Sequence, residues 1–317
     1  MKLLYPTSIK LDLETPLRPQ HPDIVLVAYD PALPVPDAHL DAAVLVAWAN
    51  SAANLAHAAA HMPALRWIQS LAAGPNDVLA AGFDRARVAV TSGSGLHNVP
   101  VAEHALGLLL NAARRFYEMR DYQSQKTWAG HLRGDPTRPG YMFSTLRNAN
   151  ITIWGYGNIA KTLAPHLQAL GATVRGVART PGVRDGVEVF SEDKLPELLR
   201  TTDALVMILP GSDATRHALN AERLGYLREH AWVVNVGRGS SLDEAALVDA
   251  LEKHQIGGAA LDVFEEEPLP ASSKLWDAPN LILSPHAAGN RPLGSEVLIA
   301  ENLKLFLEGK TLTNAMP

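Results

Sequence analysis

The sequence of 317 residues contains no cysteine. This absence excludes disulfides, thiolate zinc sites and cysteine nucleophiles, and it fits a reducing compartment. Long apolar runs are also missing, since no stretch reaches the ~18 uninterrupted apolar residues of a membrane-spanning helix. The first residues, Met1–Pro6, lack the apolar core of a secretory signal. These absences predict a soluble, cytoplasmic protein without a membrane partner.

Clusters of basic residues are scarce as well. The chain has 28 Lys and Arg against 33 Asp and Glu, for a net charge of −5, and its longest basic run is the pair Arg114–Arg115. It therefore lacks the basic patch that marks a nucleic-acid partner. No G-x-S-x-G elbow is present either, which argues against a nucleophilic hydrolase. Apolar residues are plentiful at 47%, so packed cores are expected, and the length favours two domains.

Short apolar runs alternate with helical patterns along the chain, in two groups. The first group of expected strands is Ile24–Ala28, Ala43–Ala47, Arg66–Gln69 and Val88–Thr91. The second group is Ile151–Trp154, Thr173–Ala178, Ala204–Leu209, Trp232–Val236, Ala259–Val263 and Leu281–Ser284. Runs of Val, Ile, Leu and Ala indicate strands that are buried on both faces, as in parallel sheets covered by helices. The predicted class is α/β, with two Rossmann- or flavodoxin-like domains and a cleft between them.

Two long apolar helices, Val101–Tyr122 and Gly294–Leu307, bracket the second group. They predict a chain that leaves its first domain and later returns to it. The expected domains are residues 1–98 with 290–317, and residues 99–289. Residues 126–144, rich in Gly, Pro and Arg, form either a disordered loop or an arm that packs on a partner subunit.

A capping box is expected where the second group continues after Trp232–Val236. Ser241 and Glu244 have the spacing of such a box. They predict a helix over Leu242–His254 that ends at Gly257–Gly258.

The most distinctive local motif is a glycine turn of the form G-x-G-x-x-A after the strand Ile151–Trp154. Gly155 suits the tight turn, Gly157 allows a pyrophosphate to approach the backbone, and Ala160 permits close packing of helix on strand. The phosphates would bind at the N-terminus of the following helix. The expected cofactor contacts here are Gly155, Tyr156, Gly157, Asn158 and Ile159.

The next strand carries the signal that separates NAD from NADP. An NAD site has Asp or Glu about 20 residues beyond the glycines, to bind the ribose 2′-hydroxyl. No acid occurs between Gly155 and Asp185, and the strand ends instead in Arg179 and Thr180. A guanidinium and a hydroxyl suit a 2′-phosphate, although a solvated surface arginine is the alternative. The sequence favours NADP(H), with NAD(H) as the second choice.

Polar residues follow the last three expected strands. They are Arg238, which lies between two glycines, a run of acids within 262–267, and His286. In a parallel sheet all three groups lie at the carboxyl edge, where open α/β sheets bind ligands. A guanidinium binds a carboxylate and polarises the adjacent carbonyl, while an imidazole held by a carboxylate donates a proton as hydride arrives. The pattern predicts reduction of a 2-oxo acid.

Together with the glycine turn, these segments resemble the D-isomer-specific 2-hydroxyacid dehydrogenase family, which includes glyoxylate/hydroxypyruvate reductases and phosphoglycerate dehydrogenases. The family's catalytic arginine, glutamate and histidine fall on Arg238, Glu267 and His286, and their spacing fits the family pattern. The likeness runs from about Leu65 to Leu307. It implies a split substrate domain, a central Rossmann domain, a small 2-oxo or 2-hydroxy acid as substrate, and usually a homodimer.

The resemblance also assigns roles to residues around these three. Ala73 and Gly74 match a loop whose backbone amides bind the substrate carboxylate, and residues 94–98 and 102–104 match the hinge region that lines the cleft. The substrate contacts that it implies are Ala73, Gly74, Arg238 and His286. The further cofactor contacts that it implies are Leu209, Pro210, Val236, Gly237, Arg238, Asp262, His286 and Gly289.

Some positions depart from the family pattern. Ala160 replaces the usual third glycine, and Asn290–Pro292 stands where Thr or Ser is common, which leaves the rim of the substrate pocket open. Glu267, in place of glutamine, argues against formate dehydrogenase. The end at Pro317 predicts no C-terminal regulatory domain. A glyoxylate/hydroxypyruvate-type reductase is the resulting specific prediction.

Other functions remain as alternatives. A nucleotide-sensing interaction protein, like the co-repressors that share this fold, would keep the cofactor site without efficient turnover. His57 and His61 lie one turn apart on an expected helix, but without a third ligand they are interpreted as surface histidines, and no metal is predicted. Trp48 either lines the substrate pocket or packs in the core.

Overall fold

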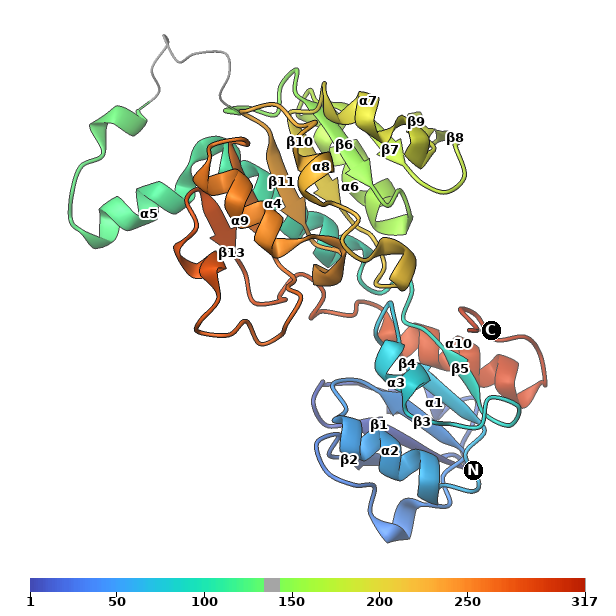
Figure 1. Cartoon of the computed structure of the whole chain (residues 1–317). Helices are drawn as coiled ribbons and strands as arrows, with labels where there is room; N and C mark the ends of the chain where they lie inside the picture. Colours follow the sequence, from blue (N-terminus) through green and yellow to red (C-terminus); the bar gives the residue numbers. More distant parts are fainter. Residues whose placement is uncertain (134–142, 317) are drawn as a thin grey trace. The chain divides into compact units, whose positions relative to one another are not determined.

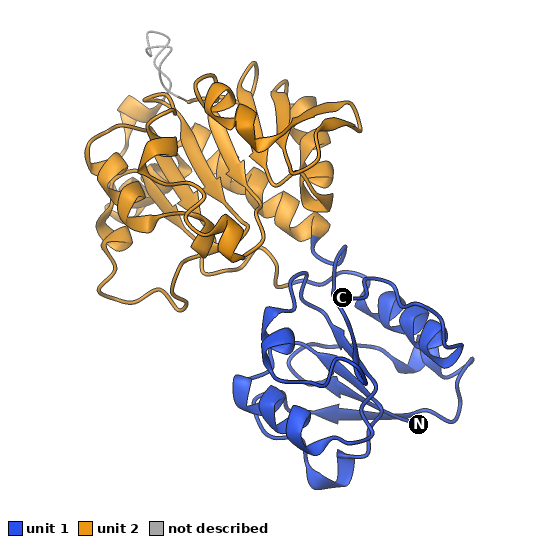
Figure 2. Cartoon of the chain, turned by 45° about the vertical axis from the view of Figure 1, so that its right-hand side comes forward, with its two compact units in different colours: residues 1–97, 291–317 blue, residues 98–290 orange. Residues whose placement is uncertain are grey.

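The computed structural model describes residues 1–133 and 143–316, and it divides into two compact units (Figures 1 and 2). Unit 1 comprises residues 1–97 and 291–317, and unit 2 comprises residues 98–290. The chain thus passes between the units one residue away from each boundary expected from the sequence. None of the helices in the described part is long and apolar enough to cross a membrane.

Unit 1 is built on a five-stranded parallel sheet in the order β2-β1-β3-β4-β5. Val44 and Val46 pack on one side with α1 and α10, while Leu45 packs on the other side with α2. Both faces of the sheet are therefore covered, which explains the continuous apolar runs in its strands. The strands are β1 Lys2–Pro6, β2 Val25–Tyr29, β3 Val44–Ala47, β4 Trp67–Ser70 and β5 Ala89–Thr91, and the helices are α1 Glu14–Leu17, α2 Ala52–His61, α3 Asn76–Ala80 and α10 Ser295–Leu307.

Unit 2 contains an eight-stranded sheet in the order β13-β12-β11-β10-β6-β7-β9-β8, parallel except for the edge pair β8 and β9. Helices α4 and α6 bury one face, and α7, α8 and α9 bury the other. The strands are β6 Asn150–Trp154, β7 Thr173–Val177, β8 Gly182–Arg184, β9 Val187–Phe190, β10 Ala204–Met207, β11 Trp232–Asn235, β12 Gly258–Leu261 and β13 Leu281–Leu283. The helices are α4 Asn98–Arg114, α5 Phe116–Ser124, α6 Asn158–Ala169, α7 Leu195–Leu199, α8 Ala221–Leu224 and α9 Glu244–Glu252.

The single helix expected over Val101–Tyr122 is wrong, because the chain forms α4 and α5 with a break at Arg115. This residue has a left-handed backbone, with φ of 55°, which ends the first helix. The side-chain oxygen of Asn111 accepts a hydrogen bond from the N–H of Tyr117 at 2.8 Å, at the start of the second helix. Of the connection at 126–144, residues 134–142 lie outside the described part of the chain.

The expected capping box at Ser241 is also wrong. The N-cap of α9 is Asp243, whose carboxylate accepts from the N–H of Ala246 at 3.0 Å. Ser241 belongs to a 3-10 turn, Gly239–Ser241, and its hydroxyl donates to the carbonyl of Arg238 at 2.7 Å. Because the Ser241 hydroxyl donates to the carbonyl of Arg238, it does not cap the helix.

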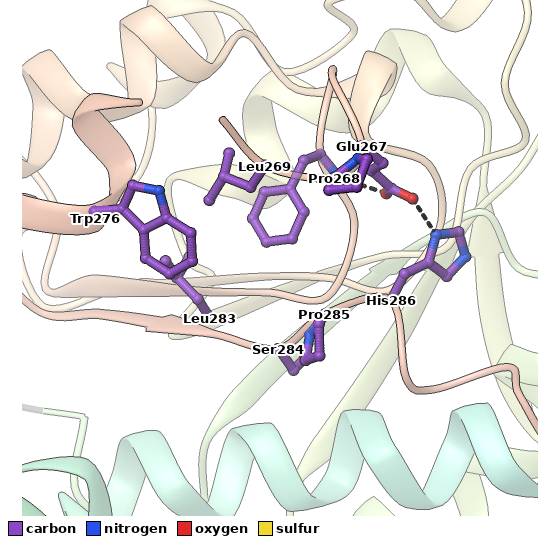
Figure 3. A pocket seen from close by; sticks show the side chains of 9 residues that line it. Glu267, Pro268, Leu269, Trp276, Leu283, Ser284, Pro285 and His286 are labelled. Carbon is purple, nitrogen blue, oxygen red and sulfur yellow. Dashed lines mark hydrogen bonds and ion pairs between the residues drawn. The ribbon is translucent and has the colours of Figure 1, made fainter. Parts of the chain in front are cut away.

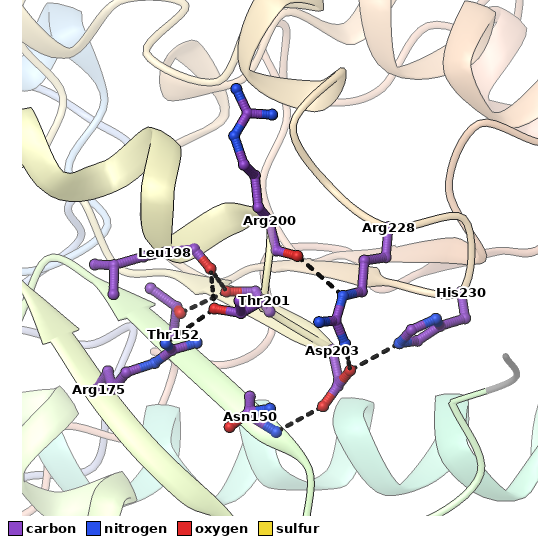
Figure 4. A network of polar contacts seen from close by, with 10 residues as sticks. Asn150, Thr152, Arg175, Leu198, Arg200, Thr201, Asp203, Arg228 and His230 are labelled. Atoms are coloured by element: carbon purple, nitrogen blue, oxygen red, sulfur yellow. Dashed lines mark hydrogen bonds and ion pairs between the residues drawn. The ribbon is translucent and has the colours of Figure 1, made fainter. Parts of the chain in front are cut away.

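A polar network joins the beginnings of several strands at the amino edge of the unit 2 sheet (Figure 4). The Asp203 carboxylate, just before β10, accepts from the N–H of Asn150 at 2.7 Å and lies 2.7 Å from Nε2 of His230. Thr152 and Thr202 share a buried hydrogen bond of 2.6 Å. These contacts hold the amino ends of β6, β10 and β11 together, so that the carboxyl edge is left for the polar residues of the candidate site.

Candidate active site

The glycine turn after β6 has a backbone that only glycine allows at its first position. Gly155 has φ of 99°, and a Cβ added there would lie 2.4 Å from the carbonyl oxygen of Ile208. The N–H groups of Gly155 and Tyr156 donate to the carbonyl of Val177 at 2.9 and 3.1 Å, which ties the turn to β7. Over Gly157 the space is open, because a Cβ added there would meet no described atom within 4 Å.

Helix α6 begins directly after Gly157. It is 12 residues long, and no side chain of the described residues caps its N-terminus. The first-turn N–H groups of Asn158, Ile159 and Ala160 are therefore available to an anion, at the positive end of the helix dipole. Ala160 is fully buried against the sheet. The open backbone and the uncapped helix fit a dinucleotide pyrophosphate.

The residues expected to select the cofactor, Arg179 and Thr180, are exposed at the end of β7. A second arginine, Arg184 on β8, returns to the same place. Its Nη1 donates to the carbonyl of Tyr156 at 2.7 Å, and its Nη2 donates to the carbonyl of Thr180. This guanidinium thus joins the glycine turn to the end of β7, the two segments that flank a cofactor ribose in this type of fold.

Arg184 was not among the residues expected from the sequence, although the sequence contains a signal for the hairpin that carries it. Asp185 and Gly186 both have positive φ, at 51° and 80°, and they turn the chain between β8 and β9. An Asp-Gly pair is a strong hairpin signal. The hairpin folds β8 back toward the glycine turn, and Asp185 pairs with Lys161 of α6 at 3.4 Å.

On the other side of the turn, the ends of β10 and β11 pack backbone against backbone. A Cβ added to Gly237 would lie 2.7 Å from the backbone nitrogen and oxygen of Leu209. Leu209 and Val236 are buried, whereas Pro210 is exposed. The predicted cofactor contacts of these two segments therefore adjoin one another at the carboxyl edge of the sheet.

Arg238 follows β11, and its backbone is fixed by its neighbours. Its carbonyl accepts from the hydroxyl and N–H of Ser241 and from Nδ2 of Asn235, at 2.7, 3.1 and 3.2 Å. A Cβ added to Gly239 would lie 1.9 Å from the carbonyl carbon of Phe264. The arginine turn therefore rests directly on the loop that follows β12, and only glycine permits that approach.

That loop carries Glu267, which is in direct contact with His286 (Figure 3). One carboxylate oxygen of Glu267 accepts from the N–H of Phe264 at 3.0 Å, and the other lies 2.5 Å from Nδ1 of His286. A carboxylate on Nδ1 fixes the orientation of the ring. Nε2 of His286 is then the nitrogen that can give a proton to a substrate.

The backbone of His286 is held in a left-handed conformation, with φ of 49°. Its N–H donates to the carbonyl of Asp262 at 2.8 Å, and its carbonyl accepts from Nδ2 of Asn290 at 2.9 Å. Gly289, which precedes Asn290 in the sequence, is partly buried. A histidine in this sparsely populated region is costly unless its surroundings impose it.

Asp262, 1% exposed, organises the same loop from below. Its carboxylate accepts from the N–H groups of Ala287 and Ala288 at 2.8 and 3.0 Å and from the Ser284 hydroxyl at 2.6 Å, and it lies 3.3 Å from Nε2 of His104. Burial alone raises the pKa of Asp262, but the hydrogen bonds from His104, Ser284 and the two amides outweigh it and hold the pKa below its ordinary value.

An apolar cavity of about 660 Å³ adjoins Glu267 and His286 on the Nδ1 side of the ring (Figure 3). Its remaining lining residues are Phe264, Pro268, Leu269, Trp276, Leu283, Ser284 and Pro285. The pair itself faces solvent, because the side chains of His286 and Glu267 are 43% and 34% exposed. Within the described ranges, no group of three or more His, Asp or Glu residues is arranged to hold a metal ion.

In unit 1, Ala73 and Gly74 lie in the loop between β4 and α3. Neither of their N–H groups donates a hydrogen bond within the part of the chain that the structure describes. Two consecutive free amides in a fixed loop form a binding place for a carboxylate. This geometry suits the role that the family resemblance gave them.

Comparison with known proteins identifies the family. A family model described as "D-isomer specific 2-hydroxyacid dehydrogenase, NAD binding domain" matches residues 106–288. The glyoxylate reductase of Aeropyrum pernix is 34% identical over 257 residues, which cover 80% of this chain and 76% of that protein. The sequence and the curated relative therefore point to the same family.

Solved structures resemble the whole chain. A D-isomer specific 2-hydroxyacid dehydrogenase family protein from Aeromonas salmonicida matches with a TM-score of 0.85 at 29% identity, covering 100% of this chain and 98% of that one. A D-isomer specific 2-hydroxyacid dehydrogenase from Xanthobacter autotrophicus, in complex with NADPH and MES, matches with a TM-score of 0.79 at 28% identity, covering 100% and 97%. Both likenesses agree with the predicted α/β class.

Proposed function

Because this chain belongs to the D-isomer specific 2-hydroxyacid dehydrogenase family, we propose that it is an NADPH-dependent glyoxylate/hydroxypyruvate-type reductase. Membership makes it an oxidoreductase that acts on CH–OH donors with NAD(P). The observation that carries the proposal is the Glu267–His286 pair at the sheet edge that also bears Arg238 and the glycine turn. The reaction converts a 2-oxo acid, NADPH and a proton into the D-2-hydroxy acid and NADP⁺.

The residues of this chain divide the work of carbonyl reduction. A bound NADPH supplies the hydride that reaches the carbonyl carbon. Arg238 binds the substrate carboxylate and draws charge toward the carbonyl oxygen. His286 donates a proton from Nε2 to that oxygen, because its Nδ1 is committed to Glu267 at 2.5 Å. Glu267 positions the ring and stabilises its charged form.

The substrate carboxylate has a second binding place in this proposal. The free N–H groups of Ala73 and Gly74 donate to it, and unit 1 is accordingly the substrate-binding domain. Hydrogen bonds from backbone amides fix the orientation of a small anion at little entropic cost, since the amides are already ordered.

The preference for NADPH rests on two arginines near the end of β7. Arg179 is exposed and free to reach a 2′-phosphate, while Arg184 is anchored between the carbonyls of Tyr156 and Thr180. The nearest acid, Asp185, is paired with Lys161. The related Xanthobacter protein was solved with NADPH, which supports the same choice. A homodimer in the cytoplasm completes the proposal, and light scattering on the purified protein tests its oligomeric state.

An initial-rate screen tests the function. Purified protein is assayed with NADPH and with NADH against glyoxylate, hydroxypyruvate and phenylpyruvate. We expect oxidation of NADPH with glyoxylate or hydroxypyruvate, at a kcat/KM well above that with NADH. A large excess of kcat/KM with NADH overturns the cofactor assignment. Failure to oxidise either cofactor across the panel favours a nucleotide-sensing interaction protein instead.

A further inference from the structure

A buried histidine, His97, holds the loop that carries Ala73 and Gly74. Its side chain is 5% exposed, and its Nε2 lies 2.7 Å from the carbonyl oxygen of Leu71. A carbonyl oxygen only accepts hydrogen bonds, so Nε2 carries the proton and donates. The bond joins the last residue before the chain enters unit 2 to a loop 26 residues earlier.

A second contact holds the same loop one residue further on. The N–H of Gly93 donates to the carbonyl of Ala72 at 2.7 Å, and a Cβ added to Gly93 would lie 2.0 Å from the carbonyl oxygen of Leu71. Residues 93–97 therefore lie directly against the loop and bind two of its carbonyl groups, those of Leu71 and Ala72.

These two contacts fix the peptide units on either side of Ala72, and the second one sets the direction of the free amide of Ala73. In a trans peptide unit, the C=O of one residue and the N–H of the next point in opposite directions. With the carbonyl of Ala72 directed at Gly93, the N–H of Ala73 is directed away from the segment 93–97. The bond from His97 fixes the preceding peptide unit, so that the chain enters Ala73 and Gly74 in one direction.

The imidazole of His97 is itself immobilised. It stacks on the indole of Trp48 with ring centroids 5.6 Å apart and planes 20° from parallel. On its other side in the chain, the carbonyl of Leu96 accepts from the N–H of Leu293 at 2.9 Å, where the chain has returned to unit 1. The imidazole is therefore held in place by the stacking on Trp48 and by the neighbouring backbone bond, and its hydrogen bond fixes the position of the Leu71 carbonyl.

We propose that His97 is a positioning residue, which aims the amides of Ala73 and Gly74 at the carboxylate of the 2-oxo acid. In this proposal it acts on the substrate through the loop. This inference rests on the proposed function, because it names how that function binds its substrate. It also gives Trp48 a role, as the surface that holds the imidazole.

Two variants of equal side-chain length separate the hydrogen bond from the packing. His97→Gln keeps an N–H donor at the same reach as Nε2, whereas His97→Met fills a similar space without one. We expect His97→Met to raise the KM for glyoxylate about tenfold, as for the loss of a hydrogen bond that orders the binding loop, with the KM for NADPH within about twofold. His97→Gln should restore the KM for glyoxylate. The exposed His61, changed to Met, is the matched control in the same unit.

Calorimetric titration of oxalate into the protein with NADP⁺ measures binding without turnover. The Kd for oxalate should be raised in His97→Met and close to the wild-type value in His97→Gln. A wild type that reduces no 2-oxo acid overturns the proposed function. A wild type that reduces glyoxylate, together with an unchanged KM in His97→Met, overturns the role of His97 alone. Equal increases in the Gln and Met variants also overturn it, because packing rather than the donor then matters. A thermal melt of each variant identifies any loss of folding, and His97→Phe, which keeps the ring stacked on Trp48, then replaces His97→Met.

Discussion

At the scale of single residues, the candidate site depends on groups whose positions are set by backbone contacts. Glu267 binds the N–H of Phe264 with one oxygen and His286 with the other. Gly239 lets the arginine turn rest on the same Phe264. The side chains that would do the chemistry are therefore held by hydrogen bonds and close packing before any ligand binds, which lowers the cost of reaching the reactive geometry.

Replacing His286 with alanine removes the proton donor. We expect kcat for NADPH oxidation with glyoxylate to fall by about 10²- to 10⁴-fold, the usual contribution of a positioned acid. The Kd for NADP⁺, measured by calorimetry, should change little, since the glycine turn is untouched. A His286→Ala variant with near-normal kcat would contradict the assignment of His286 as the acid.

Asp262 makes the stability of the loop that carries His286 depend on pH. Its pKa is lowered in the folded state, so its carboxylate contributes stability above its ordinary value of 3.8, and this contribution is lost as the pH falls through the folded-state pKa. In Asp262→Asn the amide presents a donor to the N–H groups of Ala287 and Ala288. We expect a loss of about 1–3 kcal/mol in unfolding free energy at pH 7.

Urea unfolding at pH 7, 5 and 3.5 measures this effect. The difference between wild type and Asp262→Asn should be constant from pH 7 to 5 and shrink at pH 3.5. A difference that grows in acid would show that the carboxylate is not the group that stabilises the loop.

At the scale of elements, the sequence predicted what periodicity and glycine spacing encode. Most of the buried strands and the turn at Gly155 were found, because apolar runs and backbone requirements are local, but β8 and β9 were not expected. Strand β1 was missed, although Leu3 and Leu4 are fully buried, because five residues that end in proline give too short a pattern. The break at Arg115 was missed because it depends on a left-handed residue other than glycine or asparagine.

In the candidate site, too, the sequence predicted only the residues that lie in local patterns. Arg238, Glu267 and His286 each follow a readable strand, and the family resemblance named them. The contact of Arg184 with Tyr156 depends on how the hairpin β8–β9 folds back, and that of His97 with Leu71 joins residues far apart in the sequence. Long-range hydrogen bonds of this kind leave no periodic signal, so they became visible only in the fold.

The hairpin β8–β9 carries its own prediction. Replacing Arg184 with glutamine removes a charge that we expect to face the 2′-phosphate. The ratio of kcat/KM for NADPH to that for NADH should fall by about 10- to 100-fold, as for the loss of a charge-assisted hydrogen bond. Arg120→Gln, on the exposed face of α5, serves as the control.

Steady-state kinetics with both cofactors decides the outcome. A fall in kcat/KM with NADPH alone supports the placement of Arg184 at the 2′-phosphate. An equal loss with NADPH and NADH would instead assign Arg184 to the shape of the glycine turn.

At the scale of the whole molecule, the chain folds into two units with separate cores, and it crosses between them twice. A ligand bound to one unit therefore stabilises that unit first. NADP⁺ at about 100 times its Kd should add about 2.7 kcal/mol to the stability of the state that binds it. We expect a higher melting temperature with NADP⁺ than with NAD⁺ at equal concentration, measured by differential scanning calorimetry.

A transition that NADP⁺ shifts should belong to unit 2. Limited proteolysis of unliganded and NADP⁺-bound protein, followed by mass spectrometry, locates the protected peptides. Protection confined to residues 1–97 would contradict the placement of the cofactor site.

The β8–β9 hairpin also has a consequence for how such an enzyme changes over time. It is the edge of its sheet, closed by Asp185 and Gly186 and joined to the rest of the unit through β9. Residues 182–190, nine in all, can be exchanged or redesigned there while Glu267 and His286, at the opposite end of the sheet, keep their contact. In the proposed function, the choice of cofactor and the reduction of the substrate can therefore evolve separately.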